Sequence, residues 1–183
     1  MDRTGLLEEI VGKKDGCRFL HNVPVPQVTI DSVIKNRKTC ATNVCKCYDT
    51  SWTCPPHCGS EQFCVDRIHS HKDADVYVRT FNNVDFSDEE QLDAMMNGFR
   101  QECREIMTEF RKRGYDMFAL ADGPCSYCKR CAVKDGKPCY HPEMQVPSVS
   151  GYGIDMKSYL EPLGEEFTFK KDSVTLYGIL LFK

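Results

Sequence analysis

Cysteines are gathered in two short stretches of this chain, and this pattern restricts what the chain can fold into more than any other feature. The sequence has 183 residues, of which twelve are cysteine. Five cysteines lie within residues 40–58 and four within residues 125–139. Disulfides are one explanation, but the chain is longer than typical disulfide scaffolds, and we expect no export signal. The cysteines therefore indicate metal binding or redox chemistry.

The composition favours a single domain that spans residues 1–183. Hydrophobic residues make up 41% of the chain and charged residues 28%, a mixture that can bury its own core at this length. No internal repeat and no Pro/Ser-rich linker marks a second domain. We expect residues 1–25 to form a loosely packed N-terminal segment.

Charge and hydropathy argue against two classes of partner. The net charge is -3 and the pI is about 6.0, so no broad positive field attracts nucleic acid. No apolar run approaches the roughly 20 residues that span a bilayer, and the N-terminus is mixed polar sequence. We expect a cytoplasmic protein that binds neither nucleic acid nor membrane.

Four segments have the β-branched or apolar composition of strands. They are residues 28–34, 75–81, 117–121 and 174–182. The first segment runs directly into the first cysteine stretch. The third is wholly apolar, which suits the centre of a sheet.

Two helices are predicted between these strands. Apolar residues recur at three- and four-residue steps across residues 92–110, with a capping-box pattern at Ser87 and a stop at Gly114. Cys103 lies on this apolar stripe, so we expect it in the core. A shorter helix starts near Asp155. Together these elements predict an α+β fold with a single mixed or antiparallel sheet of about four strands, two main helices and metal-binding loops at strand ends.

The second cysteine stretch carries the stronger metal signal. Cys125, Cys128 and Cys131 form two successive C-x2-C steps, and thiolates so close together can each bind a different iron of a cubane cluster. A zinc site with four cysteine ligands is the alternative. Cys139 is the natural fourth ligand, but it stands near Pro142, and a cysteine preceding a proline can instead ligate a second cluster.

The first cysteine stretch contains Cys40, Cys45, Cys47, Cys54 and Cys58. Pro55 and Pro56 fix the direction of the chain after the fourth of these cysteines and remove two backbone N–H groups, so their turn can hold a ligand rigidly. The single tryptophan, Trp52, either shields a cluster from water or packs as an ordinary core residue.

Other polar residues near the cysteines have two interpretations. Lys46, Lys129 and Arg130 either stabilise a reduced cluster and dock an electron donor, or are simply solvated loop charges. Four histidines are possible ligands in principle, but with so many thiolates present we expect them at the surface or in support of the ligands. They are His57, His69, His71 and His141.

With these residues the chain resembles a prokaryotic family of cysteine-rich, predicted metal-binding proteins that is common in anaerobes and has no defined function. The likeness extends from about Cys40 to the C-terminus. The matching motifs are Cys40-x4-Cys45-x2-Tyr48, Ser51-Trp52-Thr53-Cys54-Pro55-Pro56, the triple-cysteine loop after Gly123, Cys139-x-His141-Pro142, Pro147-Ser148 and Gly153-Ile154-Asp155.

The resemblance implies metal binding by seven cysteines and brings no established reaction with it. The implied ligands are Cys40, Cys45, Cys54, Cys125, Cys128, Cys131 and Cys139. Cys47, Cys58 and Cys64 look additional to the family pattern. The stretch Ser148-Val149-Ser150-Gly151 lacks the acidic residue expected after Pro-Ser, so no role is assigned to a carboxylate there.

Seven ligands are one fewer than two fully thiolate-ligated 4Fe-4S clusters need. Either Cys47, Cys58 or Cys64 supplies the eighth, or one iron stays open to a substrate. Our leading hypothesis is an iron-sulfur protein with one or two 4Fe-4S clusters that transfers electrons to a redox partner protein. An open site would instead indicate an iron-sulfur enzyme for sulfur transfer or reductive chemistry. A zinc-stabilised interaction module is the third alternative.

Overall fold

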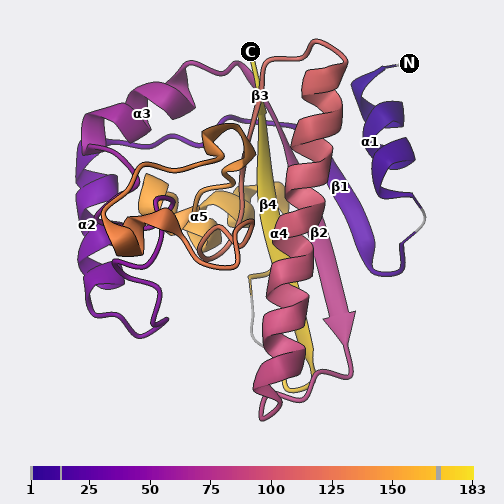
Figure 1. Cartoon of the computed structure of the whole chain (residues 1–183). Coiled ribbons are helices and arrows are strands. Elements are labelled where there is room, and N and C mark those ends of the chain that lie inside the picture. Colours follow the sequence, from indigo (N-terminus) through magenta and orange to yellow (C-terminus); the bar gives the residue numbers. More distant parts are fainter. Residues whose placement is uncertain (1, 13, 168–169) are drawn as a thin grey trace.

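The computed structural model describes residues 2–12, 14–167 and 170–183 (Figure 1). This part of the chain has an α+β fold with one antiparallel sheet of four strands, which confirms the predicted fold class. The strands are β1 (Cys17–Val23), β2 (Asp73–Asn82), β3 (Met117–Leu120) and β4 (Ser173–Phe182). The α-helices are α1 (Arg3–Val11), α2 (Ile30–Ala41), α3 (Glu61–His69), α4 (Glu89–Lys112) and α5 (Met156–Leu160). The short 3-10 helices are η1 (Ala132–Asp135), η2 (Pro142–Met144), η3 (Ser150–Tyr152) and η4 (Glu161–Leu163).

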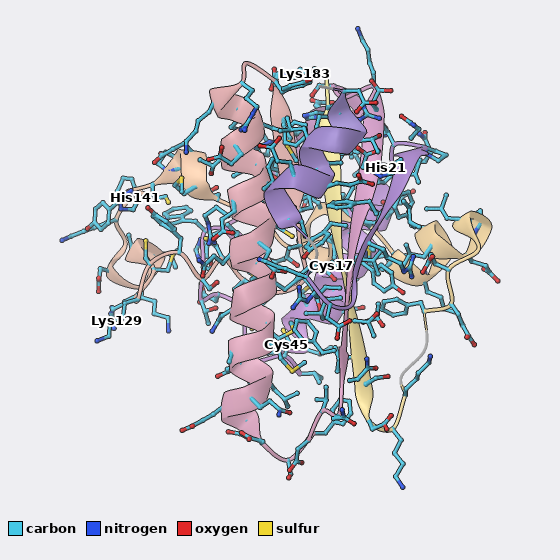
Figure 2. All side chains as sticks on the ribbon, turned by 90° about the vertical axis from the view of Figure 1, so that its right-hand side faces the viewer. Cys17, His21, Cys45, Lys129, His141 and Lys183 are labelled. Atoms are coloured by element: carbon cyan, nitrogen blue, oxygen red, sulfur yellow. The ribbon has the colours of Figure 1, made fainter. Side chains whose placement is uncertain are left out.

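The sheet has the strand order β1-β2-β4-β3, and different helices cover its two faces (Figures 1 and 2). Side chains alternate between these faces along β4. Leu176 and Leu180 pack in the core that α1 and α4 share with the sheet. Ile179 and Leu181 pack in the opposite core, to which α2 and α3 contribute. This second core also contains Cys58 of the first cysteine stretch and Phe118 and Leu120 of β3, the strand that precedes the second stretch.

α4 is an amphipathic helix whose ends are marked by local residues. Its N-cap is Asp88, which accepts a hydrogen bond from the Gln91 amide, so the predicted cap at Ser87 was wrong by one residue. Gly114 follows the helix with φ 86°, which confirms the predicted stop. Cys103 is fully buried on the apolar face, as predicted. None of the described helices is long and apolar enough to cross a membrane.

Two strand predictions need correction. Residues 28–34 do not form a strand, because Thr29 and Ser32 make a capping box and α2 starts at Ile30. β3 is an edge strand and does not lie at the sheet centre. Its continuation is covered by the chain itself, since the Ala121 amide donates to the Pro147 carbonyl at 3.0 Å. The first cysteine stretch therefore follows a helix, whereas the second follows a strand as predicted.

The N-terminal segment is packed against the body of the protein, contrary to the expectation that it is loosely attached. Leu6, Leu7 and Val11 of α1 are buried in the core beside α4. β1 pairs antiparallel with β2 from Cys17 onwards.

The helix predicted near Asp155 is present, since this residue caps α5. Sequence periodicity did not predict α1, β1 and α3.

Replacing Arg3 by alanine is expected to lower the free energy of unfolding by about 2–3 kcal/mol. The Arg3 guanidinium lies 3.0 Å from the carboxylate of Asp75, which is fully buried on β2. Without Arg3 this carboxylate would keep only its bond from the Asn22 amide and a weak contact with His21. Urea denaturation would measure the loss. An unchanged midpoint would show that α1 does not stabilise this charge.

Candidate metal centre

The second cysteine group lies in the loop that follows β3. Gly123 lies early in this loop with φ 75°, a backbone conformation that favours glycine, and a Cβ there would lie 2.6 Å from the Arg100 guanidinium. Cys125, Cys128, Cys131 and Cys139 are all half-buried free thiols. Burial raises the pKa of Cys128, and the charges of the other three cysteines raise it further. The four predicted ligands are therefore neighbours.

The first cysteine group lies between α2 and α3. Cys40 is in the last turn of α2, and the other members follow in the loop. Cys54 is buried, and its pKa is raised first by that burial and then by the nearby charges of Cys47, Cys58, Cys45 and Cys40. The structure thus brings the three predicted ligands of this group, Cys40, Cys45 and Cys54, into one neighbourhood.

Hydrogen bonds join the two groups to each other. The buried Thr53 hydroxyl accepts from the Cys125 amide at 2.7 Å, and the Thr53 carbonyl accepts from the Ser148 amide at 3.2 Å. Trp52 donates its ring N–H to the Lys137 carbonyl at 3.0 Å, two residues before Cys139. Trp52 therefore connects the two loops, which is a role that its sequence context did not indicate.

Two arginines of α4 lie beside the cysteines. The nearly buried Arg104 directs Nη2 towards Cys125 Sγ at 3.7 Å and donates from Nε to the Met144 carbonyl at 2.9 Å. Arg100 donates from Nε to the Asp122 carbonyl at 2.8 Å. Burial lowers the pKa of Arg100, and the charges of Asp122, Cys47, Cys54 and Cys125 oppose that shift. Arg100 thus lies near both cysteine groups.

Sequence reasoning missed these arginines and selected exposed charges in their place. Lys46, Lys129 and Arg130 are all exposed, and Arg130 pairs with Asp135 at 2.7 Å. The available signal was the four-residue spacing of Arg100 and Arg104, which places both on one side of α4. That spacing alone could not show which loop they meet.

Two of the four candidate histidines, His57 and His71, contact protein groups other than the predicted ligands. His57 Nε2 is 2.6 Å from Asp49 Oδ1, and its ring lies edge-on to Trp52. His71 is buried, its Nδ1 is 2.7 Å from the Arg67 carbonyl, and burial lowers its pKa. These contacts agree with a supporting rather than a ligating role.

The donor set consists of thiols, which suits soft metals and iron-sulfur clusters. Among the residues described in the structure, no group of three or more His, Cys, Asp or Glu side chains is arranged to hold a metal ion as it stands. The thiols of each group are close enough to influence one another's pKa, so they would have to draw together to bind metal. The residues fit a thiolate centre in chemistry and neighbourhood.

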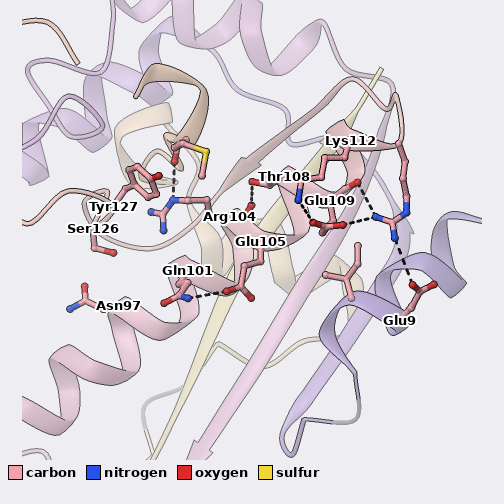
Figure 3. Close-up of a pocket in the computed structure, with 13 residues that line it drawn as sticks. Glu9, Asn97, Gln101, Arg104, Glu105, Thr108, Glu109, Lys112, Ser126 and Tyr127 are labelled. Carbon is pink, nitrogen blue, oxygen red and sulfur yellow. Dashed lines mark hydrogen bonds and ion pairs between the residues drawn. The ribbon is translucent and has the colours of Figure 1, made fainter. Parts of the chain in front are cut away.

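A polar groove of about 770 Å³ runs along α4 beside the second cysteine group (Figure 3). Ser126 and Tyr127 of the cysteine loop form one side of it. Glu109 accepts hydrogen bonds from Lys112, as Figure 3 shows, and from Arg113 at 2.8 Å. The groove offers charged and aromatic groups next to the loop that carries Cys125.

Replacing Thr53 by valine is expected to destabilise the protein by about 1–2 kcal/mol. The valine methyl group cannot accept the hydrogen bond from the Cys125 amide, so that half-buried donor loses its partner. Thr42→Val is the matched control, because its hydroxyl is exposed and bonds only within its own helix end. Urea denaturation of both variants would measure the difference. Equal midpoints would contradict a structural link between the two groups.

The chain has an α+β fold in which two groups of thiols lie in neighbouring loops. These features define its class as a cysteine-rich metal-binding protein. The chain belongs to the family described as "Predicted metal-binding protein (DUF2284)", whose model matches residues 24–182. This finding confirms the resemblance drawn from the motifs. No curated protein and no solved structure matches the chain.

Proposed function

We propose that this chain is a cytoplasmic iron-sulfur protein that carries one or two 4Fe-4S clusters and passes electrons to a partner protein. The seven ligands of the proposal are Cys40, Cys45, Cys54, Cys125, Cys128, Cys131 and Cys139. The observation that carries it is the second group, where four neighbouring thiols include three at C-x2-C steps on one loop.

A bound cluster would supply single-electron exchange. The residues of the chain supply its surroundings. Arg100 and Arg104 place positive charge beside both cysteine groups, which favours their ionised thiolates. Thr53 and Trp52 hold the two loops together. The polar groove along α4 supports the proposal of a partner, because a protein seated there would contact the loop of Cys125.

Zinc is the second candidate, and the size of the second group favours it. Four thiolates are a complete ligand set for one structural zinc ion, whereas the first group has three cysteines in the family pattern. In that case the metal would stabilise the two loops without redox change.

An enzyme with an open iron has support from a cavity of about 330 Å³ that reaches Cys139.

Anaerobic purification followed by analysis of iron, acid-labile sulfide and zinc per chain would test the proposal. About eight irons and eight sulfides, with a brown absorption that dithionite bleaches, would indicate two clusters, and about four of each would indicate one. Stoichiometric zinc in a colourless protein would refute the redox function and leave a structural module.

A further inference from the structure

Cys58 and Cys64 form a pair that the proposed ligand set does not use. Arg37 of α2 directs the same nitrogen, Nη2, at both sulfur atoms, 3.3 Å from Cys58 Sγ and 3.2 Å from Cys64 Sγ. The Cys64 thiol also donates to the Cys58 carbonyl at 3.4 Å. Arg37 is held by the Gly151 carbonyl at 3.2 Å and the Glu61 carboxylate at 3.1 Å. The two sulfur atoms are therefore close neighbours around one fixed cation.

The two thiols differ in access. Cys58 lines the cavity of about 330 Å³ together with Trp52, Tyr152 and Cys139. Cys64 of α3 is not among the residues that line this cavity, and it has no exposed surface. A small molecule that enters the cavity would thus meet the first sulfur and not the second.

The two thiols also differ in acidity. Hydrogen bonding between the two thiol side chains lowers the pKa of Cys58 to about 7, and the positive charge of Arg37 acts in the same direction against the effect of burial. The same hydrogen bond raises the pKa of Cys64. This division resembles that of a nucleophilic thiol with a resolving partner.

We propose that Cys58 and Cys64 are a dithiol site that exchanges with low-molecular-weight disulfides entering through the cavity. The Cys58 thiolate attacks one sulfur of the disulfide, forms a mixed disulfide and releases the first thiolate. The sulfur of Cys64 then attacks Cys58 Sγ, the bond from Cys58 to the probe sulfur breaks, and the Cys64 proton passes to the second thiolate that leaves. One small disulfide is reduced to two thiols, and the protein gains one disulfide, so atoms and electrons balance.

Arg37 is the positioning residue of this site. Its guanidinium stabilises the attacking thiolate and holds both sulfur atoms within reach of each other. Gly151 completes the site, because a side chain there would lie 3.2 Å from Cys58 Sγ. This inference takes Cys58 and Cys64 as a dithiol rather than as candidates for an eighth ligand, and it leaves the seven ligands of the proposed metal centre unchanged.

The test uses the full chain with its metal bound, under anaerobic conditions, with 2-hydroxyethyl disulfide as the probe. We expect two thiols released per chain and a Cys58–Cys64 disulfide found by peptide mass spectrometry. In Cys64→Ser the reaction should stop after one thiol, with the probe attached to Cys58. Arg37→Gln should slow the first step about tenfold, from the loss of thiolate stabilisation. Cys103→Ser, which alters a fully buried thiol in the core, is the control and should react like the parent.

The outcomes separate this inference from the proposed function. Loss of metal in Cys58→Ser or Cys64→Ser would identify the pair as ligands and overturn the dithiol site, while the metal centre would stand. Exchange at the pair in a chain that binds no metal would support the dithiol site and refute the metal centre. Modification of other cysteines at the rate of Cys58 would also overturn the inference.

Discussion

Replacing Cys128 by serine is expected to remove the metal of the second cysteine group. The Cys128 thiol lies in the middle of the triple-cysteine loop, close enough to Cys125, Cys131 and Cys139 for their charges to raise its pKa. Changes to groups that only support a ligand weaken metal binding about 10- to 100-fold, and removal of a ligand costs at least as much. In a chain with two clusters, iron per chain should fall by about half.

Cys103→Ser provides the control for this experiment. It makes the same chemical change, from a thiol to a hydroxyl, at a different place. Cys103 is buried in the core between α4 and β4, where its sulfur faces Gly178. Its metal content should therefore equal that of the parent. Retention of all metal by Cys128→Ser, measured in folded protein, would show that the second group is not a metal site.

Replacing Arg100 by methionine is expected to lower the reduction potential of the bound centre by about 50 mV. The Arg100 charge lies near Cys47, Cys54 and Cys125 in a buried place, where a unit charge contributes on the order of 1 kcal/mol at an effective dielectric constant near 20. A reduced cluster is more negative, so loss of this cation disfavours reduction. Redox titration followed by visible absorption would measure the shift.

Arg130→Met is the matched control, because it removes the same charge from an exposed side chain. Arg130 is one residue before Cys131, but its side chain is 63% exposed and its guanidinium pairs with Asp135. Solvent screens such a charge, so the potential should change little. Equal shifts in the two variants would mean that burial beside the cysteines gives Arg100 no special influence.

The sequence predicted the sheet better than the helices that surround it. β2 and β4 were predicted because their apolar and β-branched runs match a buried strand. Residues 28–34 look equally strand-like, yet the hydrogen bonds between Thr29 and Ser32 start a helix there. Local composition cannot resolve this conflict, since a cap depends on backbone geometry that composition does not report.

Cysteine spacing indicated which thiols lie together, but the rest of the site depends on tertiary structure. Cys125 and Cys131 are close because a short loop forces them to be. Arg37 and Arg100, in contrast, reach the cysteines from helices α2 and α4, and their positions depend on how these helices pack. No pattern within either helix identifies the loop that it meets.

The bond from the Cys125 amide to Thr53 has a consequence for assembly. This bond and that of Trp52 cross between the loops, so ordering one loop restricts the freedom of the other. The entropy lost when the first site fills does not have to be lost again at the second. Metal uptake should therefore be cooperative, with half-loaded chains rare at substoichiometric metal. Thr53→Val should break this coupling and allow the two sites to fill independently.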